Sequence, residues 1–362
     1  MAITGPRQSG KTTLLKHILP DYQYVSLENP DYQSFATEDP VGFLKTYDQR
    51  VIFDEVQRVP TLFSYLQTIV DQRQQMGQFV LSGSQNFHLL ERITQSLAGR
   101  VAIFKLLPFD SDELSRKVAV DDWRSLIFRG FYPAIYDRDL TPAIFHTNYI
   151  QTYIQRDIVE LTNVQNTRQF RNFIELCAAR HGQLLNLSNL ANACGISQPT
   201  AKSWLSILES SHIIFLLSPY YENFSKRIVK TPKLYFYDVG LAVHLLGIRR
   251  VEDLTDQKLL GSLFENLVVA DLFKKNHHQY LLADYWFWRD SNGHEIDLLT
   301  KKVGKFDIFE IKSSQTVLRK MFKGMDYFSS ITGEKVKSQT LVYGGKDIQN
   351  RTQYQVRPWN EA

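Results

Sequence analysis

One short segment constrains this chain more than any other. Residues 5–12 read Gly-Pro-Arg-Gln-Ser-Gly-Lys-Thr and match the pattern GxxxxGK[ST] at every fixed position. Apolar Leu14, Leu15 and Ile18 follow at helical spacing, so the loop is expected to open a helix. Glycines let backbone N–H groups turn inward around phosphate oxygens, and the helix adds its positive N-terminal dipole. The sequence therefore predicts a phosphate-binding loop here.

The side chains of this loop suggest ATP with Mg²⁺ as the ligand. We expect Lys11 to neutralise the β- and γ-phosphates and the Thr12 hydroxyl to hold Mg²⁺. The expected nucleotide-binding residues of the loop are Gly5, Pro6, Arg7, Gln8, Ser9, Gly10, Lys11, Thr12 and Thr13. The alternative is a Gly-rich turn between a strand and a helix that holds no ligand.

A second motif argues against that alternative. Residues 51–53 form an apolar, β-branched run that ends in the adjacent carboxylates Asp54 and Glu55. At the end of a buried strand, Asp54 would reach the Mg²⁺ ion and Glu55 would act as the general base for a water facing the γ-phosphate. A surface Asp-Glu pair is common after a strand, but this one follows the phosphate loop at the expected place.

Further short strands complete an α/β pattern. Residues 24–27 and 79–82 also read as strands, and segments such as 62–74 read as helices between them. This alternation predicts a parallel sheet of four strands, with helices on both faces and ligands at the carboxyl ends of the strands. In P-loop ATPases with an extra strand between the two motifs, a polar residue after the next strand senses the γ-phosphate, and either Ser82 or Ser84 fits. Only four residues precede Gly5, so we expect either a short first strand or a chain that starts downstream of the ancestral one, with a weakened nucleotide domain.

Two arginines are candidates for completing the nucleotide site. Arg100 follows Leu97-Ala98-Gly99 and precedes an apolar, strand-like stretch at 101–107. Arg156 lies in a predicted helix at 149–160. Each is either an arginine finger or a structural arginine held in a salt bridge, and the sequence leaves both interpretations open.

The middle of the chain has the spacing of a helix-turn-helix. We expect Ser188 to cap a short helix, Gly195 to break it, and Ser197 to cap a second helix that runs to about Ser210. Polar residues on the outer face of the second helix would contact DNA, namely Gln198, Thr200, Lys202 and Ser206. A basic loop then resembles the wing of a winged helix, with phosphate contacts expected from Lys226, Arg227, Lys230 and Lys233. The alternative is a winged helix that serves only as a packing module.

The C-terminal third carries a second group of carboxylates. A predicted helix at 259–275 contains Glu265, and a predicted hairpin of strands at 285–289 and 295–299 contains Asp297. A third strand at 306–311 leads into Glu310 and Lys312, which share a face because strand residues alternate. PD-(D/E)xK nucleases use this spacing. We expect Glu265, Asp297 and Glu310 to hold a divalent metal and Lys312 to act on the attacking water, unless the fold is an inactive version that only holds DNA.

Composition limits the remaining possibilities. A chain of 362 residues is expected to hold two or three domains, and its net charge of +4 leaves any nucleic-acid partner to local basic clusters. Cys177 and Cys194 are the only cysteines, which excludes a disulfide scaffold and a CxxC zinc site and favours the reducing cytoplasm. With no apolar run of about 18 residues and no leader, we expect neither a membrane partner nor secretion.

Together, these motifs resemble a large bacterial and archaeal family of AAA-superfamily ATPases. The pieces that carry the resemblance are Gly5–Thr13, Phe53–Gln57, Ser82–Ser84, Leu97–Arg100, Gly130–Pro133, Arg156-Asp157 and Glu310–Lys312. The resemblance implies ATP binding and hydrolysis, a winged helix and a restriction-endonuclease-like C-terminal domain. It also implies a homo-oligomer or protein partner that supplies an arginine, and a further segment before the first strand that this sequence lacks.

The expected architecture is thus α/β, with a P-loop NTPase sheet of the AAA/ASCE type in residues 1–120. A helical lid or linker is expected at 121–165, a winged-helix module at 166–240 and a PD-(D/E)xK nuclease-like domain at 241–362. The function expected from this order is an Mg²⁺-dependent ATPase coupled to a DNA-contacting, nuclease-like half. The alternative is a nucleotide-gated DNA- or protein-binding switch with an inactive nuclease-like core.

Overall fold

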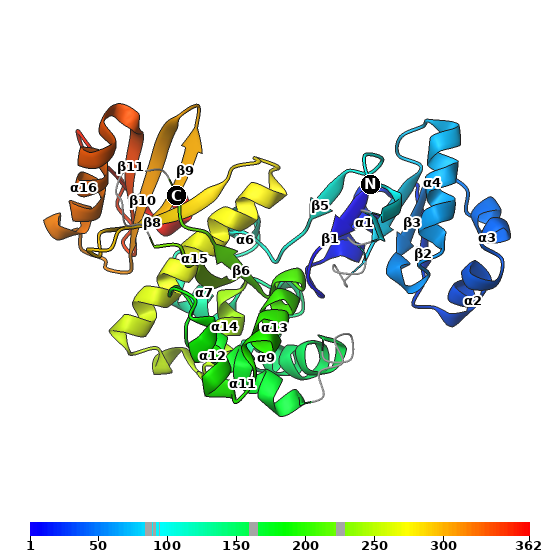
Figure 1. Cartoon of the computed structure of the whole chain (residues 1–362), viewed down its shortest axis with the longest axis horizontal. Coiled ribbons are helices and arrows are strands. Elements are labelled where there is room, and N and C mark those ends of the chain that lie inside the picture. Colours follow the sequence, from blue (N-terminus) through cyan, green and yellow to red (C-terminus); the bar gives the residue numbers. More distant parts are fainter. Residues whose placement is uncertain (84–88, 90–91, 94, 159–165, 222–228) are drawn as a thin grey trace. The chain divides into compact units, whose positions relative to one another are not determined.

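The computed structural model describes the 362-residue chain apart from residues 84–88, 90–91, 94, 159–165 and 222–228, and only the backbone of 155–158. The chain forms two compact units (Figure 1). The first unit is Met1–Pro108 with the short segment Ser210–His212. The second unit is Phe109–Glu209 with Ile213–Ala362.

The first unit is the predicted α/β sheet. Its strands are β1 (Ala2–Thr4), β2 (Gln23–Ser26), β3 (Val51–Asp54), β4 (Phe79–Ser82) and β5 (Ile103–Lys105). Its described helices include α1 (Lys11–Ile18), α2 (Pro30–Glu38), α3 (Pro40–Thr46) and α4 (Leu62–Arg73), with a 3-10 turn at Val56–Arg58. The four predicted strands are confirmed to within a residue, and β5 lies inside the strand-like stretch at 101–107.

All neighbouring strands in this sheet are parallel, in the order β2-β3-β4-β1-β5. Side chains alternate between the faces, so Phe53 packs into a core with residues of α2, α3 and α4, while Ile52 packs with Leu15 of α1. Helices therefore cover both faces, as predicted. The first strand is short, as expected, with three residues, and it is paired on both sides: Ala2 lies opposite Leu81 and Ile103.

The second unit begins with helices and a small hairpin. The described helices are α6 (Ser111–Ser115), α7 (Trp123–Arg129), α8 (Pro133–Asp137), α9 (Pro142–Tyr149), a π-helix (Ile150–Ile158), α11 (Thr167–Ala178), α12 (Leu187–Cys194), α13 (Gln198–Ser210), α14 (Val239–Leu245) and α15 (Gln257–His278). The hairpin pairs β6 (Ile214–Leu217) with β7 (Lys233–Phe236) in antiparallel register. A 3-10 turn at Val251–Asp253 precedes α15.

A mixed sheet of six strands completes the second unit. Its order is β12-β13-β11-β10-β9-β8, made of β8 (Tyr285–Arg289), β9 (Glu295–Lys302), β10 (Lys305–Lys312), β11 (Val336–Tyr343), β12 (Gln349–Asn350) and β13 (Gln355–Pro358). Helix α16 (Lys323–Thr332) packs on it through Met325 and Phe328, which join a core with Trp288 and Phe306. Short 3-10 segments lie at Arg319–Phe322, Gly333–Lys335 and Trp359–Glu361. The predicted hairpin at 285–299 is confirmed, with β9 longer than expected.

Three details of the sequence prediction are corrected. Asn186, not Ser188, caps α12, because its side chain accepts the backbone N–H of Asn189. The helix around Glu265 begins at Gln257, where Asp256 caps it, and extends to His278. The helix predicted at 149–160 is instead the end of α9 followed by a π-helix from Ile150.

The predicted cap of the second helix is confirmed, since the Ser197 hydroxyl accepts the N–H of Thr200 at 3.2 Å. Among the described residues, no helix has the length and apolar character needed to cross a membrane.

Candidate functional site

The phosphate loop connects the end of β1 to the first turn of α1. Gly5 has φ +147°, and a Cβ there would lie 1.9 Å from the Leu106 carbonyl oxygen, so only glycine fits this close approach. Gly10, at φ 94°, lies immediately before α1 and lets the chain enter the helix. The two fixed glycines of the motif therefore have separate steric reasons.

Lys11 points back into the loop. Its Nζ donates to the carbonyl oxygens of Gly5 at 2.9 Å and Pro6 at 2.7 Å, and the residue is buried. Burial lowers the pKa of Lys11 to about 8, although the nearby carboxylates of Glu55 and Asp54 favour its charged form. The ammonium is held by neutral carbonyls and forms no ion pair among the described contacts.

Thr12 and Asp54 meet as the metal-binding prediction requires. The Thr12 hydroxyl donates to Asp54 Oδ2 at 3.0 Å, and the Tyr24 hydroxyl donates to the same oxygen at 2.5 Å. Burial and the hydrogen bond to Asp54 raise the pKa of Tyr24, so it stays a neutral donor. Tyr24 lies on β2 and was not identified from sequence.

Glu55 follows β3 in a left-handed conformation, with φ 55°. Its carboxylate accepts a short hydrogen bond from the Gln57 side-chain amide. The strand register sets Asp54 beside Ser82, at the end of β4. Glu55 and Ser82 thus lie at the carboxyl edge of the sheet where the phosphate loop begins.

The loop fits a phosphate ligand by an independent criterion. Ser9 Oγ and Ser82 Oγ are buried and lack a hydrogen-bond partner among the described residues, so the site has polar atoms that the chain itself does not satisfy. Arg7 lies 4.0 Å from Glu28 in an ion pair, and the side chains of Gln8 and Thr13 are exposed. Pro6 is buried and contributes its carbonyl to Lys11.

Some predicted residues cannot be placed. Ser84 of the nucleotide site lies outside the described residues, and so do Lys226 and Arg227 of the predicted wing. The backbone of Arg156 belongs to the π-helix, but its side chain is not among those described.

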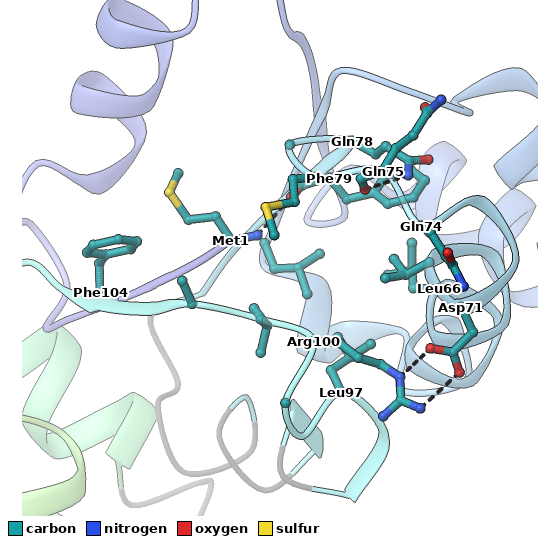
Figure 2. Close-up of a pocket in the computed structure, with 17 residues that line it drawn as sticks. Met1, Leu66, Asp71, Gln74, Gln75, Gln78, Phe79, Leu97, Arg100 and Phe104 are labelled. Atoms are coloured by element: carbon teal, nitrogen blue, oxygen red, sulfur yellow. Dashed lines mark hydrogen bonds and ion pairs between the residues drawn. The ribbon is translucent and has the colours of Figure 1, made fainter.

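Arg100 lies elsewhere in the first unit (Figure 2). Its guanidinium is paired with Asp71 of α4, with Nε 2.5 Å from Oδ1 and an Nη 3.0 Å from Oδ2. The pair borders a pocket of about 780 Å³ that Met1 and Phe79 also line. These two residues lie at the amino ends of β1 and β4, whereas the phosphate loop follows the carboxyl end of β1. The structure therefore does not bring Arg100 to the phosphate loop of its own chain, and the salt-bridge alternative describes its geometry.

The second unit brings the C-terminal carboxylates together in an open pocket of about 570 Å³. Lys312 Nζ lies 3.1 Å from Asp297 Oδ2 and 2.6 Å from Glu310 Oε1. Asp297 Oδ2 also accepts the backbone N–H of Ile311 at 2.8 Å. As predicted from strand alternation, Glu310 and Lys312 share a face and lie beside Asp297.

Burial and neighbouring charges shift the pKa of Glu310, Asp297 and Lys312. Burial and the Asp297 carboxylate raise the pKa of Glu310 to about 8, against the attraction of Lys312. Burial opposes the charge of Asp297, but Lys312 and Lys233 hold its pKa below the ordinary value. Burial alone would lower the pKa of Lys312, yet Asp297 and Glu310 raise it.

Glu265 joins the same pocket from α15, together with two residues that the sequence analysis did not assign to it. Lys233 Nζ lies 2.9 Å from Glu265 Oε1 and makes a short ion pair with Glu295. Glu295 is two residues before Asp297 on β9, so strand periodicity alone could have identified it. Lys233 was expected on a wing that contacts phosphate, but this is wrong: it lies in β7, buried among carboxylates.

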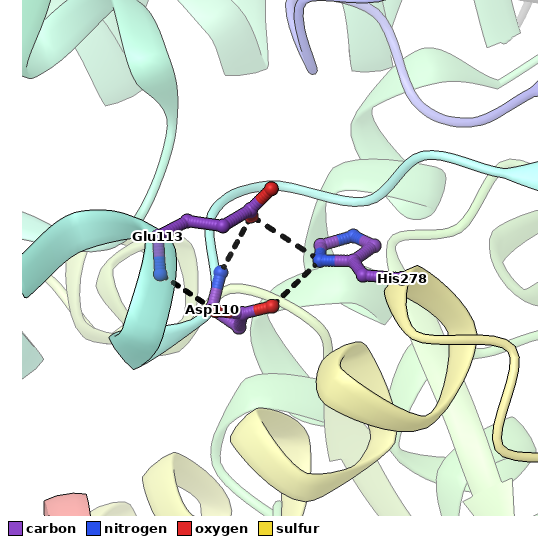
Figure 3. Close-up of side chains that lie close together, drawn as sticks. All are labelled: Asp110, Glu113 and His278. Atoms are coloured by element: carbon purple, nitrogen blue, oxygen red, sulfur yellow. Dashed lines mark hydrogen bonds and ion pairs between the residues drawn. The ribbon is translucent and has the colours of Figure 1, made fainter. Parts of the chain in front are cut away.

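A further group of potential metal ligands lies where α6 packs on α15 (Figure 3). His278 Nδ1 is 2.8 Å from Asp110 Oδ2 and 3.2 Å from Glu113 Oε2. Asp110 and Glu113 form a capping box that begins α6. Burial disfavours a charged His278, but hydrogen bonds to the two carboxylates raise its pKa to about 9. Asp110 and Glu113 cap α6 and also pair with His278, so the observed geometry is that of an ion-paired helix cap.

The outer face of α13 is exposed as predicted. Gln198, Lys202 and Ser206 are exposed and Thr200 is half-buried, while Ala201, Leu205 and Leu208 are buried. Lys230 is also exposed.

Family comparisons agree with the first unit. A model described as an AAA domain matches residues 1–115, and two models described as domains of unknown function, DUF8612 and DUF4143, match residues 120–252 and 260–361. The fold, the phosphate loop and this match define the first unit as a P-loop ATPase domain of the AAA superfamily.

Two curated relatives extend the match along most of the chain. These are the uncharacterized proteins Mb2031c of Mycobacterium bovis and Rv2008c of Mycobacterium tuberculosis. Each is 30% identical over 321 residues, covering 87% of this chain and 70% of the relative. The chain belongs to the same family as these two proteins.

Solved structures give weaker matches. A Thermotoga maritima RuvB variant is 16% identical with a TM-score of 0.28, covering 59% of this chain and 80% of that one. The Aeropyrum pernix ORC1 protein in complex with DNA is 14% identical with a TM-score of 0.28, covering 70% of this chain and 88% of that one. Similarity this low carries no argument here.

Proposed function

We propose that the protein is an Mg²⁺-dependent ATPase whose nucleotide state controls a DNA-contacting second unit. The observation that carries this proposal is the convergence of Lys11, Thr12 and Asp54 at the carboxyl edge of the first sheet. Lys11 is held by two carbonyls that phosphate oxygens can replace at little cost, because no ion pair has to be broken. Thr12 and Asp54 offer the oxygen ligands that Mg²⁺ prefers.

Each residue of the site has one task in this proposal. Thr12 and Asp54 would hold Mg²⁺, which would neutralise phosphate charge. Lys11 balances phosphate charge, and the hydroxyls of Ser9 and Ser82, which have no partner among the described residues, donate to phosphate oxygens. Glu55 accepts the proton of the attacking water, after the amide of Gln57 releases its carboxylate.

The test is ATP binding and turnover by the full chain, with and without DNA. Lys11→Ala should lose ATP binding by at least about 100-fold, because the Lys11 ammonium is the cation that the carbonyls of Gly5 and Pro6 hold inside the loop. Lys45→Ala is the matched control, since Lys45 is an exposed lysine on α3 of the same unit. Unchanged turnover in Lys11→Ala would reject the nucleotide site.

DNA contact is the part of this proposal that rests on α13. Its exposed face offers one cation, Lys202, and polar groups that suit phosphate and base contacts. Affinity for duplex DNA should fall as salt rises, and Lys202→Ala with Lys230→Ala should reduce the slope, because each phosphate contact releases counterions. Binding without any salt dependence would favour a protein partner instead.

Metal-dependent cleavage of DNA is a second candidate activity. The observation in its favour is Lys312 beside Asp297 and Glu310, with Glu310 Oε2 buried and lacking a partner among the described residues. The two carboxylates would hold a divalent cation, and Lys312 would orient the attacking water. Lys312→Ala should then abolish cleavage and keep metal binding, whereas Asp297→Ala should lose both.

The competing interpretation is a nucleotide-gated switch with an inactive nuclease-like core. It predicts DNA binding by the wild type, modulated by ATP, with no cleavage under Mg²⁺ or Mn²⁺. Cleavage that persists equally in Lys312→Ala and Asp297→Ala would indicate a contaminating nuclease.

A further inference from the structure

The C-terminal pocket contains two lysines that differ sharply in exposure. The side chain of Lys312 is 36% exposed, whereas that of Lys233 is 4% exposed. Lys312 lies between Asp297 and Glu310, and Lys233 lies between Glu265 and Glu295. The pocket is therefore built from two pairs of carboxylates, each with one ammonium between its members.

The backbone around Lys233 holds that ammonium in place. Lys233 pairs with Leu217 in the β6-β7 hairpin, and on its other side it forms a bridge with Leu184. A residue paired on both sides cannot withdraw its side chain by a small loop movement. Lys312 is at the end of β10, and its long, partly exposed side chain can rotate toward solvent.

The carboxylates on the two sides also differ. Glu310 Oε2 is buried with no hydrogen-bond partner among the described residues, so the Lys312 side offers an oxygen for an additional ligand. On the other side, Glu265 Oε1 already accepts from Lys233 and from the Tyr235 hydroxyl. Glu295 is engaged by Lys233 and, at 3.2 Å, by Arg289.

A cation that enters this pocket thus meets two different situations. At Asp297 and Glu310 it has to displace only a partly exposed ammonium. At Glu265 and Glu295 it would have to displace a buried ammonium, which leaves that charge without a partner and costs several kcal/mol. The first position is accessible to a metal ion and the second is already filled.

We propose that the Lys233 ammonium occupies the place of a second divalent cation, so that the C-terminal pocket takes one metal ion, at Asp297 and Glu310. The inference rests on the metal centre of the proposed nuclease site. Glu265 then acts as the partner of Lys233 and does not ligate the metal. Lys233 comes from the hairpin that follows α13, so the α13 module supplies part of the charge of the metal pocket.

The experiment counts Mn²⁺ ions bound to nucleotide-free full-length protein by calorimetry and by electron paramagnetic resonance. All variants carry Asp54→Ala, which removes the carboxylate of the nucleotide site. The parent should bind one Mn²⁺, and Lys233→Met should bind two, because Glu265 and Glu295 become free to ligate. The neutralised variant Lys233→Met/Glu265→Gln/Glu295→Gln should return to one.

Lys301→Met is the matched control, because Lys301 lies on β9 of the same sheet and donates to the Tyr220 hydroxyl. It should bind one Mn²⁺, like the parent. Two ions in the parent, or one ion in both the parent and Lys233→Met, would overturn the proposal. No ion in the parent with one in Lys233→Met would reject the metal centre of the proposed nuclease and still support the role of Lys233.

Melting curves cover the case in which Lys233→Met folds poorly without metal. Mn²⁺ should then raise its melting temperature more than it raises that of the parent. An equal rise in the two proteins would overturn the proposal, whatever the state of the metal-free variant.

Discussion

The phosphate loop and the C-terminal pocket both combine lysine with carboxylates, but they satisfy these charges in opposite ways. At the phosphate loop, neutral groups hold Lys11 and Asp54: two carbonyls hold Lys11, and the hydroxyls of Thr12 and Tyr24 hold Asp54. In the second unit, the charges hold one another, with Lys312 between Asp297 and Glu310. A ligand of the first site replaces neutral hydrogen bonds, whereas a ligand of the second has to replace ion pairs.

This difference has a consequence for stability and for function. Charges held by neutral groups are available to a ligand, and removing one of them leaves few unmatched partners. Where charges neutralise one another, removing one leaves its partner buried and unpaired, which destabilises the fold. We therefore expect substitutions at the first site to affect chemistry without unfolding and those at the second site to affect folding as well.

The largest expected effect is on hydrolysis in the first unit. Glu55→Gln should retain ATP binding and slow turnover by about 10²- to 10⁴-fold, because an amide can position water but cannot accept its proton. Turnover is measured by phosphate release, and binding by titration with a fluorescent ATP analogue. Glu38→Gln is the control, because Glu38 is an exposed carboxylate on α2 of the same unit that accepts from the Ser34 hydroxyl. Wild-type turnover in Glu55→Gln would remove Glu55 from the base role.

The next largest effect is on the stability of the second unit, which should differ between a substitution in the C-terminal pocket and one in the phosphate site. Asp297→Ala should destabilise the second unit by roughly 2–4 kcal/mol, because Lys312 and the buried N–H of Ile311 lose their acceptor. Asp54→Ala should leave that unit unchanged. All five tryptophans lie in the second unit, so denaturation followed by tryptophan fluorescence reports on it alone. Equal midpoints for Asp297→Ala and wild type would contradict the contrast between the sites.

The comparison also shows what a sequence can reveal about such sites. The phosphate loop, the Asp54-Glu55 pair and the Asp297, Glu310 and Lys312 group were predictable, because each depends on local spacing or on strand alternation. Tyr24 was missed because its contact with Asp54 depends on how β2 aligns with β3, and the register sets Tyr24 beside Ile52. No short-range pattern encodes that alignment.

Lys233 shows the same limit over a longer distance. Its partners Glu265 and Glu295 lie 32 and 62 residues further along the chain. Glu265 is on α15, and Glu295 is on β9 of the other sheet of this unit. In sequence it follows several other basic residues, which favoured a phosphate-binding wing. Only the packing of β7 against α15 places it in the acidic pocket. The sequence left the role of Arg100 open for a related reason, since its partner Asp71 lies on α4, 29 residues earlier in the chain.

The ion pair of His278 with Asp110 and Glu113 provides a test with pH of how the loss of one charge affects stability. The folded pKa of His278, about 9, exceeds the ordinary value of 6.5, so its ion pair stabilises fully below pH 6.5 and is lost as pH rises through 9. The contribution is about 3 kcal/mol for a shift of this size. Hydrogen exchange at Ser111–Ser115 should therefore become faster, relative to the intrinsic rate, between pH 6.5 and 9. His278→Gln should make the exchange rate nearly independent of pH in this range. An unchanged profile in this variant would show that His278 does not cause the pH dependence.

The smallest expected effect is on Mg²⁺ affinity and concerns the Tyr24 hydroxyl, one of the neutral groups that hold Asp54. Asp54 Oδ2 accepts from both Tyr24 and Thr12, and each donor competes with a metal ion for the same oxygen. Removing the Tyr24 hydroxyl should therefore free one lone pair and raise Mg²⁺ affinity by roughly three- to tenfold, which corresponds to about 1 kcal/mol for one hydrogen bond. Tyr24→Phe keeps the ring, over which Lys16 lies at 3.8 Å, so packing is preserved.

Tyr22→Phe is the control for this measurement. Tyr22 lies just before the same strand, and its hydroxyl donates to the Gly77 carbonyl at 2.5 Å, away from Asp54. Mg²⁺ affinity in the presence of ATP should be unchanged in this variant and raised in Tyr24→Phe. A weaker Mg²⁺ affinity in Tyr24→Phe would mean that the hydroxyl orients Asp54 for the metal and does not compete with it. The Tyr24 hydroxyl would then position Asp54 both before and after the metal binds. The difference between the two sites would then be limited to how Lys11 and Lys312 are held.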